Sequence, residues 1–258
     1  MSVIRVSRIE YDGAAHYAVE SAGSYRLIAG DVFAGPPYKT GAEVKPTRIL
    51  PPATPSKIVA IGLNYRDHAA EMNKPLPAEP LMFLKPSTAV IGPGDAIRLP
   101  PNAGRIDHEA ELGVVIGKRA SRVPAAQALD YVLGLTCLND VTARELQRKD
   151  VQYTRGKGFD TFAPIGPCIA IGLDPAALDI EGSVNGETRQ ASNTRQLIFS
   201  VPDIIAFVSS VMTLLPGDVI ATGTPSGVGP LAHGDRVKVK IEGIGELINM
   251  VETGNGKR

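Results

Sequence analysis

The sequence has few cysteines, no tryptophan and no long apolar run. Cys137 and Cys168 are the only cysteines among its 258 residues, which excludes a disulfide scaffold and a four-cysteine metal site. Both lie in apolar runs, where we expect buried, reduced thiols. No stretch approaches about 18 consecutive apolar residues, so no membrane span is expected. The N-terminal residues alternate polar and apolar side chains instead of forming a signal sequence, and we therefore expect a cytoplasmic protein.

The sequence also lacks an excess of charge of either sign. Its 27 lysines and arginines balance its 27 aspartates and glutamates, so the formal net charge at pH 7 is zero. Proteins that bind nucleic acid usually carry a basic excess or a basic stripe. Neither nucleic acid nor a membrane is therefore expected as a partner.

Glycine and proline, by contrast, are abundant, with 27 and 21 residues. They lie between β-like runs, a distribution that predicts many short strands joined by tight turns. No alternation of strands and helices of the βαβ type is visible, which disfavours Rossmann and TIM-barrel architectures. The glycines of residues 222–229 (TGTPSGVG) fit neither of the common nucleotide-binding motifs. The expected fold class is mixed α+β and rich in β-structure.

Two unequal units are expected along the chain. Residues 1–50 predict a small β-rich N-terminal domain, and residues 51–258 a larger second domain. The stretch 35–57 carries six prolines with little periodicity, so we expect a linker there. Asn185-Gly186 predicts a hairpin turn. Helical patterns cover four segments, the last with Ser200 or Asp203 as a cap: residues 66–74, 125–132, 141–150 and 200–214.

Three acidic residues form the first candidate site. Glu109 and Glu111 are two apart on a predicted strand, so their side chains point to the same face and repel each other. Asp140 follows the apolar strand of residues 132–139. Three oxygen donors without a thiolate favour Mg²⁺ or Mn²⁺ over Zn²⁺. The alternative is a solvated strand face on which both glutamates meet water.

His68 and Glu71 form the second candidate. A spacing of three residues places both side chains on one face of a helix. Glu71 would orient the imidazole, and His68 would then act as a base towards a water molecule. The alternative is a surface ion pair that contributes well under about 1 kcal/mol.

Three further residues are candidates for contacts to a bound anion. Lys157 lies between two glycines, where it would neutralise a carboxylate or stabilise an enolate. Arg144 and Gln147 are three apart on a predicted helix that follows Asp140, so both would face a ligand bound there. The alternatives are an ordinary loop lysine and a solvated helix face.

Taken in order, these segments resemble one known family. The chain carries GLNYRDHAAEM, EPLMFLKPSTAVIGPGD, HEAELGVVIGKR, LNDVTARELQ, RGKGFDTFAPIGP, VNGETRQ, PGDVIATGTPSGVG and IEGIGEL. This series is similar to the fumarylacetoacetate hydrolase superfamily over about residues 57–252. The most similar members are the short ones: acylpyruvases, oxaloacetate decarboxylases, and the isomerase and decarboxylase enzymes of 2-hydroxyhepta-2,4-diene-1,7-dioate.

The resemblance implies a β-sandwich roll with flanking helices, preceded by a small N-terminal β domain, in a chain that forms homodimers. Residues 51–258 would then be the catalytic domain. The roles implied for individual residues are metal ligation by Glu109, Glu111 and Asp140, catalysis by His68, Glu71 and Lys157, and substrate binding by Arg144, Gln147 and Thr224. The implied cofactor is Mg²⁺ or Mn²⁺.

The resemblance implies a small 2-oxo acid as substrate. A metal-dependent hydrolase would cleave a C–C bond of a 2,4-dioxo acid such as an acylpyruvate, through a pyruvate enolate stabilised by the metal. The alternatives are an oxaloacetate decarboxylase and a 2-hydroxyhepta-2,4-diene-1,7-dioate isomerase or decarboxylase of aromatic catabolism. Lys74, Arg105 and Arg155 are candidates to bind a second carboxylate, as a dicarboxylic substrate would require.

Overall fold

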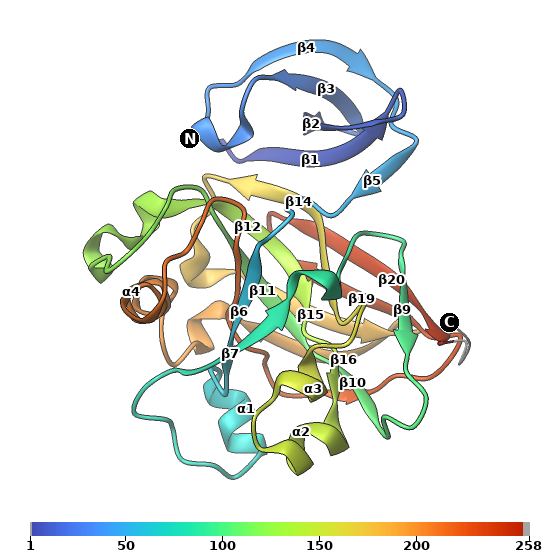
Figure 1. The fold of residues 1–258 in the computed structure, drawn as a ribbon, viewed down its shortest axis with the longest axis vertical. Helices are drawn as coiled ribbons and strands as arrows, with labels where there is room; N and C mark the ends of the chain where they lie inside the picture. Colours follow the sequence, from blue (N-terminus) through green and yellow to red (C-terminus); the bar gives the residue numbers. More distant parts are fainter. Residues whose placement is uncertain (1, 255–258) are drawn as a thin grey trace.

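Strands dominate the computed structural model, which describes residues 2–254 (Figure 1). They form a 12-stranded, a five-stranded and a three-stranded sheet. The β-rich mixed fold class predicted from the glycine and proline pattern is confirmed. Cys137 and Cys168 are buried free thiols, also as expected.

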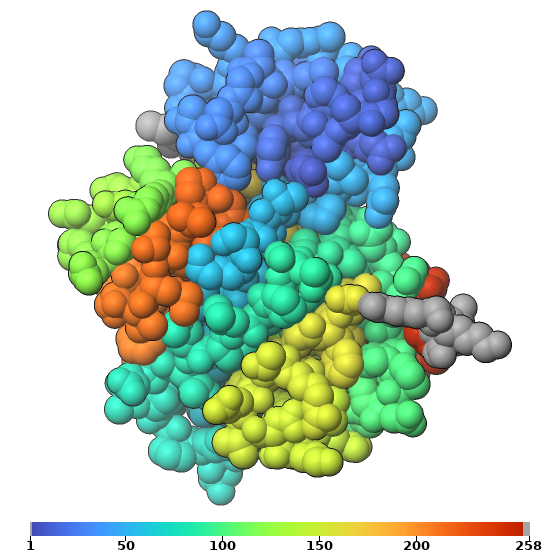
Figure 2. All heavy atoms as spheres, in the orientation of Figure 1, coloured from blue at the N-terminus to red at the C-terminus, as the bar shows by residue number. Residues whose placement is uncertain are grey.

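The first five strands form a cap at one end of the molecule, coloured blue in Figure 2. Their bounds are β1 (Ile4–Tyr11), β2 (Ala14–Ser21), β3 (Ser24–Ala29), β4 (Lys39–Val44) and β5 (Arg48–Leu50). Strand β1 also pairs with β14 (Ala163–Ile171), so the cap is continuous with the large sheet through backbone hydrogen bonds.

The expectation of a linker over residues 35–57 is wrong for part of that stretch. It contains two strands, β4 paired with β3 and β5 paired with β1. The prolines fall outside both strands, at positions where no ladder hydrogen bond is required. Partners elsewhere in the chain supplied the pairing, which local composition does not encode.

The central strands of the large sheet are buried on both faces. These are β12 (Val132–Asn139), β11 (Ala110–Ile116), β17 (Val219–Ala221) and β6 (Lys57–Gly62). The edge strand β7 (Leu81–Pro86), next to β6, and the short strand β8 (Val90–Ile91), beside β14, are less buried. Leu112 and Val114 enter one hydrophobic core, whereas Val115 enters a second one. The first core also receives α4 (Val201–Val211) and one face of the five-stranded sheet.

The two smaller sheets supply the other walls of the molecule. The five-stranded sheet contains β16 (Glu187–Asn193), β15 (Asp179–Val184), β19 (Arg236–Ile241), β20 (Gly245–Thr253) and β9 (Ala96–Leu99). The three-stranded sheet contains β13 (Thr142–Ala143), β10 (Ile106–His108) and β18 (Gly229–Pro230). The predicted hairpin is present between β15 and β16, with φ of 54° at Asn185 and 84° at Gly186. A turn with two positive φ values matches the strand twist, which explains the Asn-Gly pair.

Helices are short and few in the described residues. The α-helices besides α4 are α1 (Arg66–Glu71), α2 (Arg144–Asp150) and α3 (Thr154–Lys157). Both proposed caps of α4 act, because Ser200 and Asp203 form a capping box. The segment predicted as a helix at 125–132 is instead a 3-10 helix, η3. The 3-10 helices are η1 (Val32–Ala34), η2 (Ser87–Ala89), η3 (Ala125–Tyr131), η4 (Pro175–Ala177) and η5 (Thr194–Gln196). Within residues 2–254 no helix has the length and apolar character needed to span a membrane.

Asp218 joins the start of β6 to the chain before β17. Its carboxylate is buried and accepts hydrogen bonds from Ser56 N (3.0 Å), Ser56 Oγ (2.6 Å), Lys57 N (3.2 Å) and Leu215 N (2.8 Å). It also pairs with Lys57 Nζ. Burial opposes ionisation, but the hydrogen bonds from Lys57, Ser56 and Leu215 lower the pKa of Asp218 below its ordinary value. The ionised side chain therefore stabilises the folded state.

We expect Asp218→Asn to lower the free energy of unfolding by about 2–4 kcal/mol at pH 7, because the charge leaves while its donors stay. A folded pKa below the unfolded one contributes stability above about pH 4, and the contribution disappears as the pH falls through the folded value. Urea unfolding at pH 7 and pH 3 measures this difference. Asp130→Asn, at an exposed position, is the control. An equal difference in the free energy of unfolding between variant and wild type at both pH values would contradict the prediction.

Candidate active site

Two acidic residues lie where neighbouring strands pass from one sheet to another. Glu109 separates β10, in the three-stranded sheet, from β11, in the 12-stranded sheet. Asp140 follows β12 and precedes β13, which belong to the same two sheets. Asp140 N donates to Glu109 O (2.9 Å), and Glu109 N donates to Asn139 Oδ1 (3.0 Å). The antiparallel pairing of β11 with β12 thus brings these two corners together.

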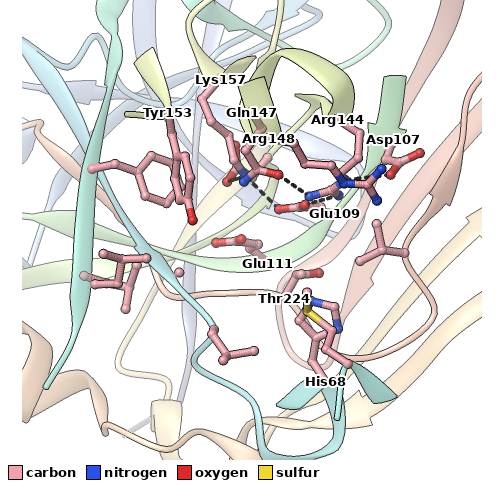
Figure 3. Close-up of a pocket in the computed structure, with 18 of the residues that line it drawn as sticks. His68, Asp107, Glu109, Glu111, Arg144, Gln147, Arg148, Tyr153, Lys157 and Thr224 are labelled. Carbon is pink, nitrogen blue, oxygen red and sulfur yellow. Dashed lines mark hydrogen bonds and ion pairs between the residues drawn. The ribbon is translucent and has the colours of Figure 1, made fainter. Parts of the chain in front are cut away.

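Glu111 completes a cluster of three carboxylates. Its side chain and those of Glu109 and Asp140 each offer an oxygen, and these oxygens lie within 4.8 Å of one another. The three residues are 2%, 5% and 1% exposed, respectively. Figure 3 shows both glutamates in the same pocket. The expected convergence is present, and burial excludes the alternative of a solvated strand face.

A buried lysine and a half-buried arginine compensate two of the three carboxylates. Glu109 accepts from Lys157 Nζ (2.8 Å) and Arg144 Nη2 (2.5 Å). Burial opposes ionisation of Glu109, but these two cations lower its pKa to about 2. Lys157 also donates to Asp140 Oδ2 (2.5 Å). Burial alone would lower the pKa of Lys157, yet Asp140, Glu109 and Glu111 raise it above the ordinary value. Lys157 is therefore a buried ammonium that bridges two carboxylates, not a loop lysine.

Lys85 is a second buried lysine in the cluster, and sequence reasoning missed it. It lies on β7, is fully buried, and donates to Asp140 Oδ1 (2.5 Å) and Val141 O (3.1 Å). Burial lowers its pKa despite the nearby carboxylate of Asp140. A charged residue inside the apolar run LMFLKP was the available signal, because an unpaired charge is rarely placed among buried strand residues.

Asp107 was missed as well. It accepts hydrogen bonds from Arg105 Nε (2.6 Å) and Arg144 Nε (2.9 Å), and it is 1% exposed. The alternation that places Glu109 and Glu111 on one face continues backwards to Asp107, so strand periodicity could have found it. Asp107 helps to hold Arg144, whose Nη1 also donates to Gln147 Oε1 (2.7 Å).

Glu111 is the carboxylate left without a cation. It accepts one hydrogen bond, from Gly223 N (2.8 Å), and within residues 2–254 no lysine or arginine pairs with it. Burial, and then the charges of Asp140 and Glu109, raise its pKa well above the ordinary value. A buried anion of this kind needs a proton or an added cation. The donor set consists of oxygens alone, so the three carboxylates fit Mg²⁺ or Mn²⁺.

His68 and Glu71 on α1 form the expected pair. His68 Nδ1 lies 2.9 Å from Glu71 Oε2, and Glu71 Oε1 accepts from Gly227 N (3.0 Å). The carboxylate therefore orients the imidazole and is itself held by the loop after β17. Figure 3 shows His68 across the pocket from Arg144, Gln147 and Lys157.

One cavity of about 400 Å³ contains most of the predicted residues. All of the proposed site residues except Glu71 line it: His68, Glu109, Glu111, Asp140, Arg144, Gln147, Lys157 and Thr224. Of the three candidates for a second carboxylate, Lys74 and Arg105 line the wall, whereas Arg155 does not and pairs with Asp150 instead. Arg148, which sequence reasoning missed, lines the wall from α2.

The walls of this cavity come from distant parts of the chain. Helix α1 and strand β7 follow each other in sequence, whereas α2 and α3 arrive from residues 144–157. Figure 2 shows the α2–α3 segment, in yellow, against the teal surface that carries α1 and β7. Contacts between α3 and β7 close this side of the pocket.

The model of the C-terminal domain of fumarylacetoacetate (FAA) hydrolases matches residues 57–252, which include every residue of the cluster. The chain belongs to the fumarylacetoacetate hydrolase family. The family resemblance stated from the sequence is thereby confirmed. The matched region begins at β6 and ends in β20, so it leaves out strands β1 to β5.

Family members similar to this chain carry several different activities in their names. An oxaloacetate tautomerase, FAHD2A, of Bos taurus mitochondria is 45% identical over 217 residues, 80% of this chain and 69% of that protein. A 2-hydroxyhepta-2,4-diene-1,7-dioate isomerase from Mycobacterium marinum is 43% identical with a TM-score of 0.90, over 98% of this chain and 100% of that one. A maleylpyruvate hydrolase from Sphingobium sp. SYK-6, solved with manganese(II) and pyruvate, is 32% identical with a TM-score of 0.81, over 97% and 100%.

Proposed function

We propose that this family member is a Mg²⁺- or Mn²⁺-dependent hydrolase of 2,4-dioxo acids of the acylpyruvate kind. Water would cleave the bond between carbons 3 and 4, giving pyruvate and a carboxylic acid. The observation that carries the proposal is one cavity lined by three buried carboxylates and, on its opposite side, a histidine oriented by a glutamate. The structure of the maleylpyruvate hydrolase, which is 32% identical to this chain, contains manganese(II) and pyruvate, the cofactor and the product class proposed here.

Each residue of the cluster has a distinct task in this proposal. Glu109, Glu111 and Asp140 would hold the cation, which when bound polarises the 2-oxo group and stabilises negative charge that develops on it. Arg144 and Lys157 keep Glu109 ionised, as its lowered pKa indicates.

His68 would act as the general base. The contact of its Nδ1 with Glu71 Oε2 places the proton on Nδ1 and leaves Nε2 with the free lone pair. Nε2 would take a proton from the attacking water and later return it to carbon 3 of the departing pyruvate enolate. The protons balance in this reaction, because the water supplies one hydroxyl to the carboxylic acid and one proton to pyruvate.

Tautomerisation of a 2-oxo dicarboxylic acid is the second candidate. It is favoured by the names of relatives at 43–45% identity, an oxaloacetate tautomerase and a dienedioate isomerase. The same base would remove a proton from carbon 3 and return it to the oxygen or to another carbon, with no attacking water. Decarboxylation of oxaloacetate would instead release CO₂ and form the pyruvate enolate of the hydrolase proposal, which then takes up a proton at carbon 3.

The ultraviolet absorbance of acetylpyruvate distinguishes these functions. With purified protein and Mg²⁺ we expect the absorbance to fall while pyruvate appears, and we expect neither change in excess EDTA. Full activity in excess chelator contradicts metal dependence. No loss in either condition overturns the hydrolase proposal, and accelerated ketonisation of enol-oxaloacetate in the same protein sample would then support the second candidate.

Arg148 is expected to favour substrates that carry a second carboxylate. It lines the cavity, and within residues 2–254 no carboxylate forms an ion pair with it. Arg148→Ala should lower kcat/KM for oxaloacetate by about three- to tenfold, the effect of losing one exposed charge pair, with little change for acetylpyruvate. Arg155→Ala is the matched control, because Arg155 is an arginine of the neighbouring helix that faces away from the cavity. An equal decrease in kcat/KM for oxaloacetate in the two variants would show that Arg148 makes no specific contact with this substrate.

A further inference from the structure

Gln190, on β16, is fully buried and uses both ends of its side-chain amide. Its Oε1 accepts a hydrogen bond from Ala110 N (2.9 Å) and lies 3.1 Å from His108 Nδ1. Its Nε2 donates to Thr224 Oγ1 (2.8 Å) and to Pro225 O (2.9 Å). A backbone amide can only donate and a carbonyl can only accept, so Ala110 and Pro225 fix which way the amide of Gln190 points.

The backbone around Gln190 leaves room for this amide. Gly182 is its partner on β15, and a Cβ at Gly182 would lie 2.8 Å from Gln190 Oε1. A Cβ at Gly227 would meet Arg189 O at 1.9 Å. Gly182 therefore leaves room for the amide of Gln190, and Gly227 allows the loop of residues 222–229 to approach β16 at a separation that a side chain at Gly227 would prevent.

Two of the four partners of Gln190 are next to residues of the carboxylate site or line the cavity. Ala110 immediately precedes Glu111, whereas Thr224 lines the cavity and follows Gly223, the donor to Glu111. Thr224 Oγ1 also donates to Ala110 O (2.9 Å), which closes a ring through Gln190, Ala110 and Thr224. The Thr224 hydroxyl is held from both sides and cannot rotate without breaking two hydrogen bonds.

We propose that Gln190 is a positioning residue that holds the Thr224–Pro225 segment against β11 and thereby sets the ligand-binding wall beside the carboxylates. Gln190 does not line the cavity, so it acts through Thr224 and not by contact with a ligand. This inference rests on the proposed function, since it assumes that the wall beside Thr224 receives a 2-oxo acid.

Gln190→Glu separates the hydrogen bond that Gln190 accepts from Ala110 N from the one that it donates to Thr224 Oγ1. The new carboxylate still accepts from Ala110 N, so the strand that carries Glu111 keeps its partner. At a pH high enough to ionise it, the new side chain can no longer donate to Thr224 Oγ1, and it repels the carbonyl of Pro225, so the titrations are run at that pH. We expect the Kd for Mn²⁺ to stay within about threefold of wild type, while the Kd for pyruvate in the Mn²⁺-loaded protein rises about tenfold or more. Isothermal titration of each ligand measures both constants.

Asn249→Asp is the matched control. Asn249 is 2% exposed on β20 of the same sheet, and its Nδ2 donates to two backbone carbonyls, Gly92 O (2.8 Å) and Asp95 O (2.9 Å). The substitution makes the same chemical change at a buried site away from the cavity. It is expected to lower Tm to a similar degree and to leave both dissociation constants unchanged.

Thr224→Val tests the same contact from the other side if Gln190→Glu does not fold. It removes the hydroxyl and keeps Gln190, and the same selective loss of pyruvate affinity is expected. The inference is overturned if either variant binds pyruvate as the wild type does, or if Mn²⁺ and pyruvate affinities fall by the same factor. Wild-type protein that binds Mn²⁺ but no pyruvate overturns the proposed function together with this inference, so the two failures are distinguishable.

Discussion

Glu111→Gln is expected to abolish the metal dependence of both activity and thermal stability. The substitution removes one of three converging carboxylates, and we expect the affinity for Mn²⁺ to fall at least about 100-fold, the upper range seen when groups around a metal are changed. Turnover of the substrate should fall to the level that wild-type protein shows in EDTA. Mn²⁺ should raise the Tm of the wild type by mass action and leave that of the variant unchanged.

The direction of the Tm change of Glu111→Gln in EDTA distinguishes a metal ligand from a residue with only a structural role. Burial and the charges of Asp140 and Glu109 raise the pKa of Glu111, so its ionised form is less favourable in the folded state than in the unfolded state. A raised carboxyl pKa opposes folding at neutral and higher pH. In EDTA at pH 8, Glu111→Gln should therefore melt at the wild-type temperature or above it. A residue with only a structural role would lower Tm when replaced.

Thermal melts with EDTA and with Mn²⁺, together with Mn²⁺ titration followed by electron paramagnetic resonance, measure these effects. Glu246→Gln is the control, because Glu246 is an exposed glutamate of β20 that pairs with Lys238 at 3.1 Å. A rise in Tm with Mn²⁺ as large in Glu111→Gln as in the wild type would rule out metal ligation by Glu111.

His68→Ala is expected to lower kcat by about 10²- to 10⁴-fold, the range for loss of a general base. The affinity for Mn²⁺ should not change, since His68 contacts Glu71 and none of the three carboxylates. Glu71→Gln keeps the hydrogen bond from Gly227 N but loses the charge beside the imidazole. It should lower kcat by less than His68→Ala does.

The test is whether His68→Ala lowers kcat while the Kd for Mn²⁺ stays unchanged. Steady-state kinetics give kcat, and the same Mn²⁺ titration gives the Kd. His16→Ala serves as the control, because His16 lies on β2 and does not line the cavity. If His68→Ala retains more than half of the wild-type kcat, the imidazole is not the base, and the pair with Glu71 only fastens α1.

Local chemistry accounts for the parts of the site that sequence reasoning located. Alternation along a strand placed Glu109 and Glu111 on one face, and helical spacing placed His68 beside Glu71. Turn and cap rules located the Asn185-Gly186 hairpin and the start of α4. In each case the interacting groups are within three residues of each other, so the backbone geometry of a single element decides the result.

Residues that act across elements were harder to find. Lys85 reaches Asp140 only because β7 lies at the edge of the large sheet beside α3. Arg148 and Arg155 have the same side-chain chemistry and are seven residues apart. Arg148 lines the cavity from α2, whereas the turn after α2 places Arg155 beside Asp150. Only the path of the chain through space separates these two arginines.

The sequence by itself determined the residue types of the site, the spacing within each motif, the β-rich fold class and the family. The tertiary structure decided which charges meet: that Lys157 bridges Glu109 and Asp140, that Glu111 has no cation, and that Gln190 joins Thr224 to β11. The physical reason is that these contacts depend on strand pairing and on the corners where strands change sheets. Both are set by the packing of residues far apart in the chain, and no local pattern carries that information.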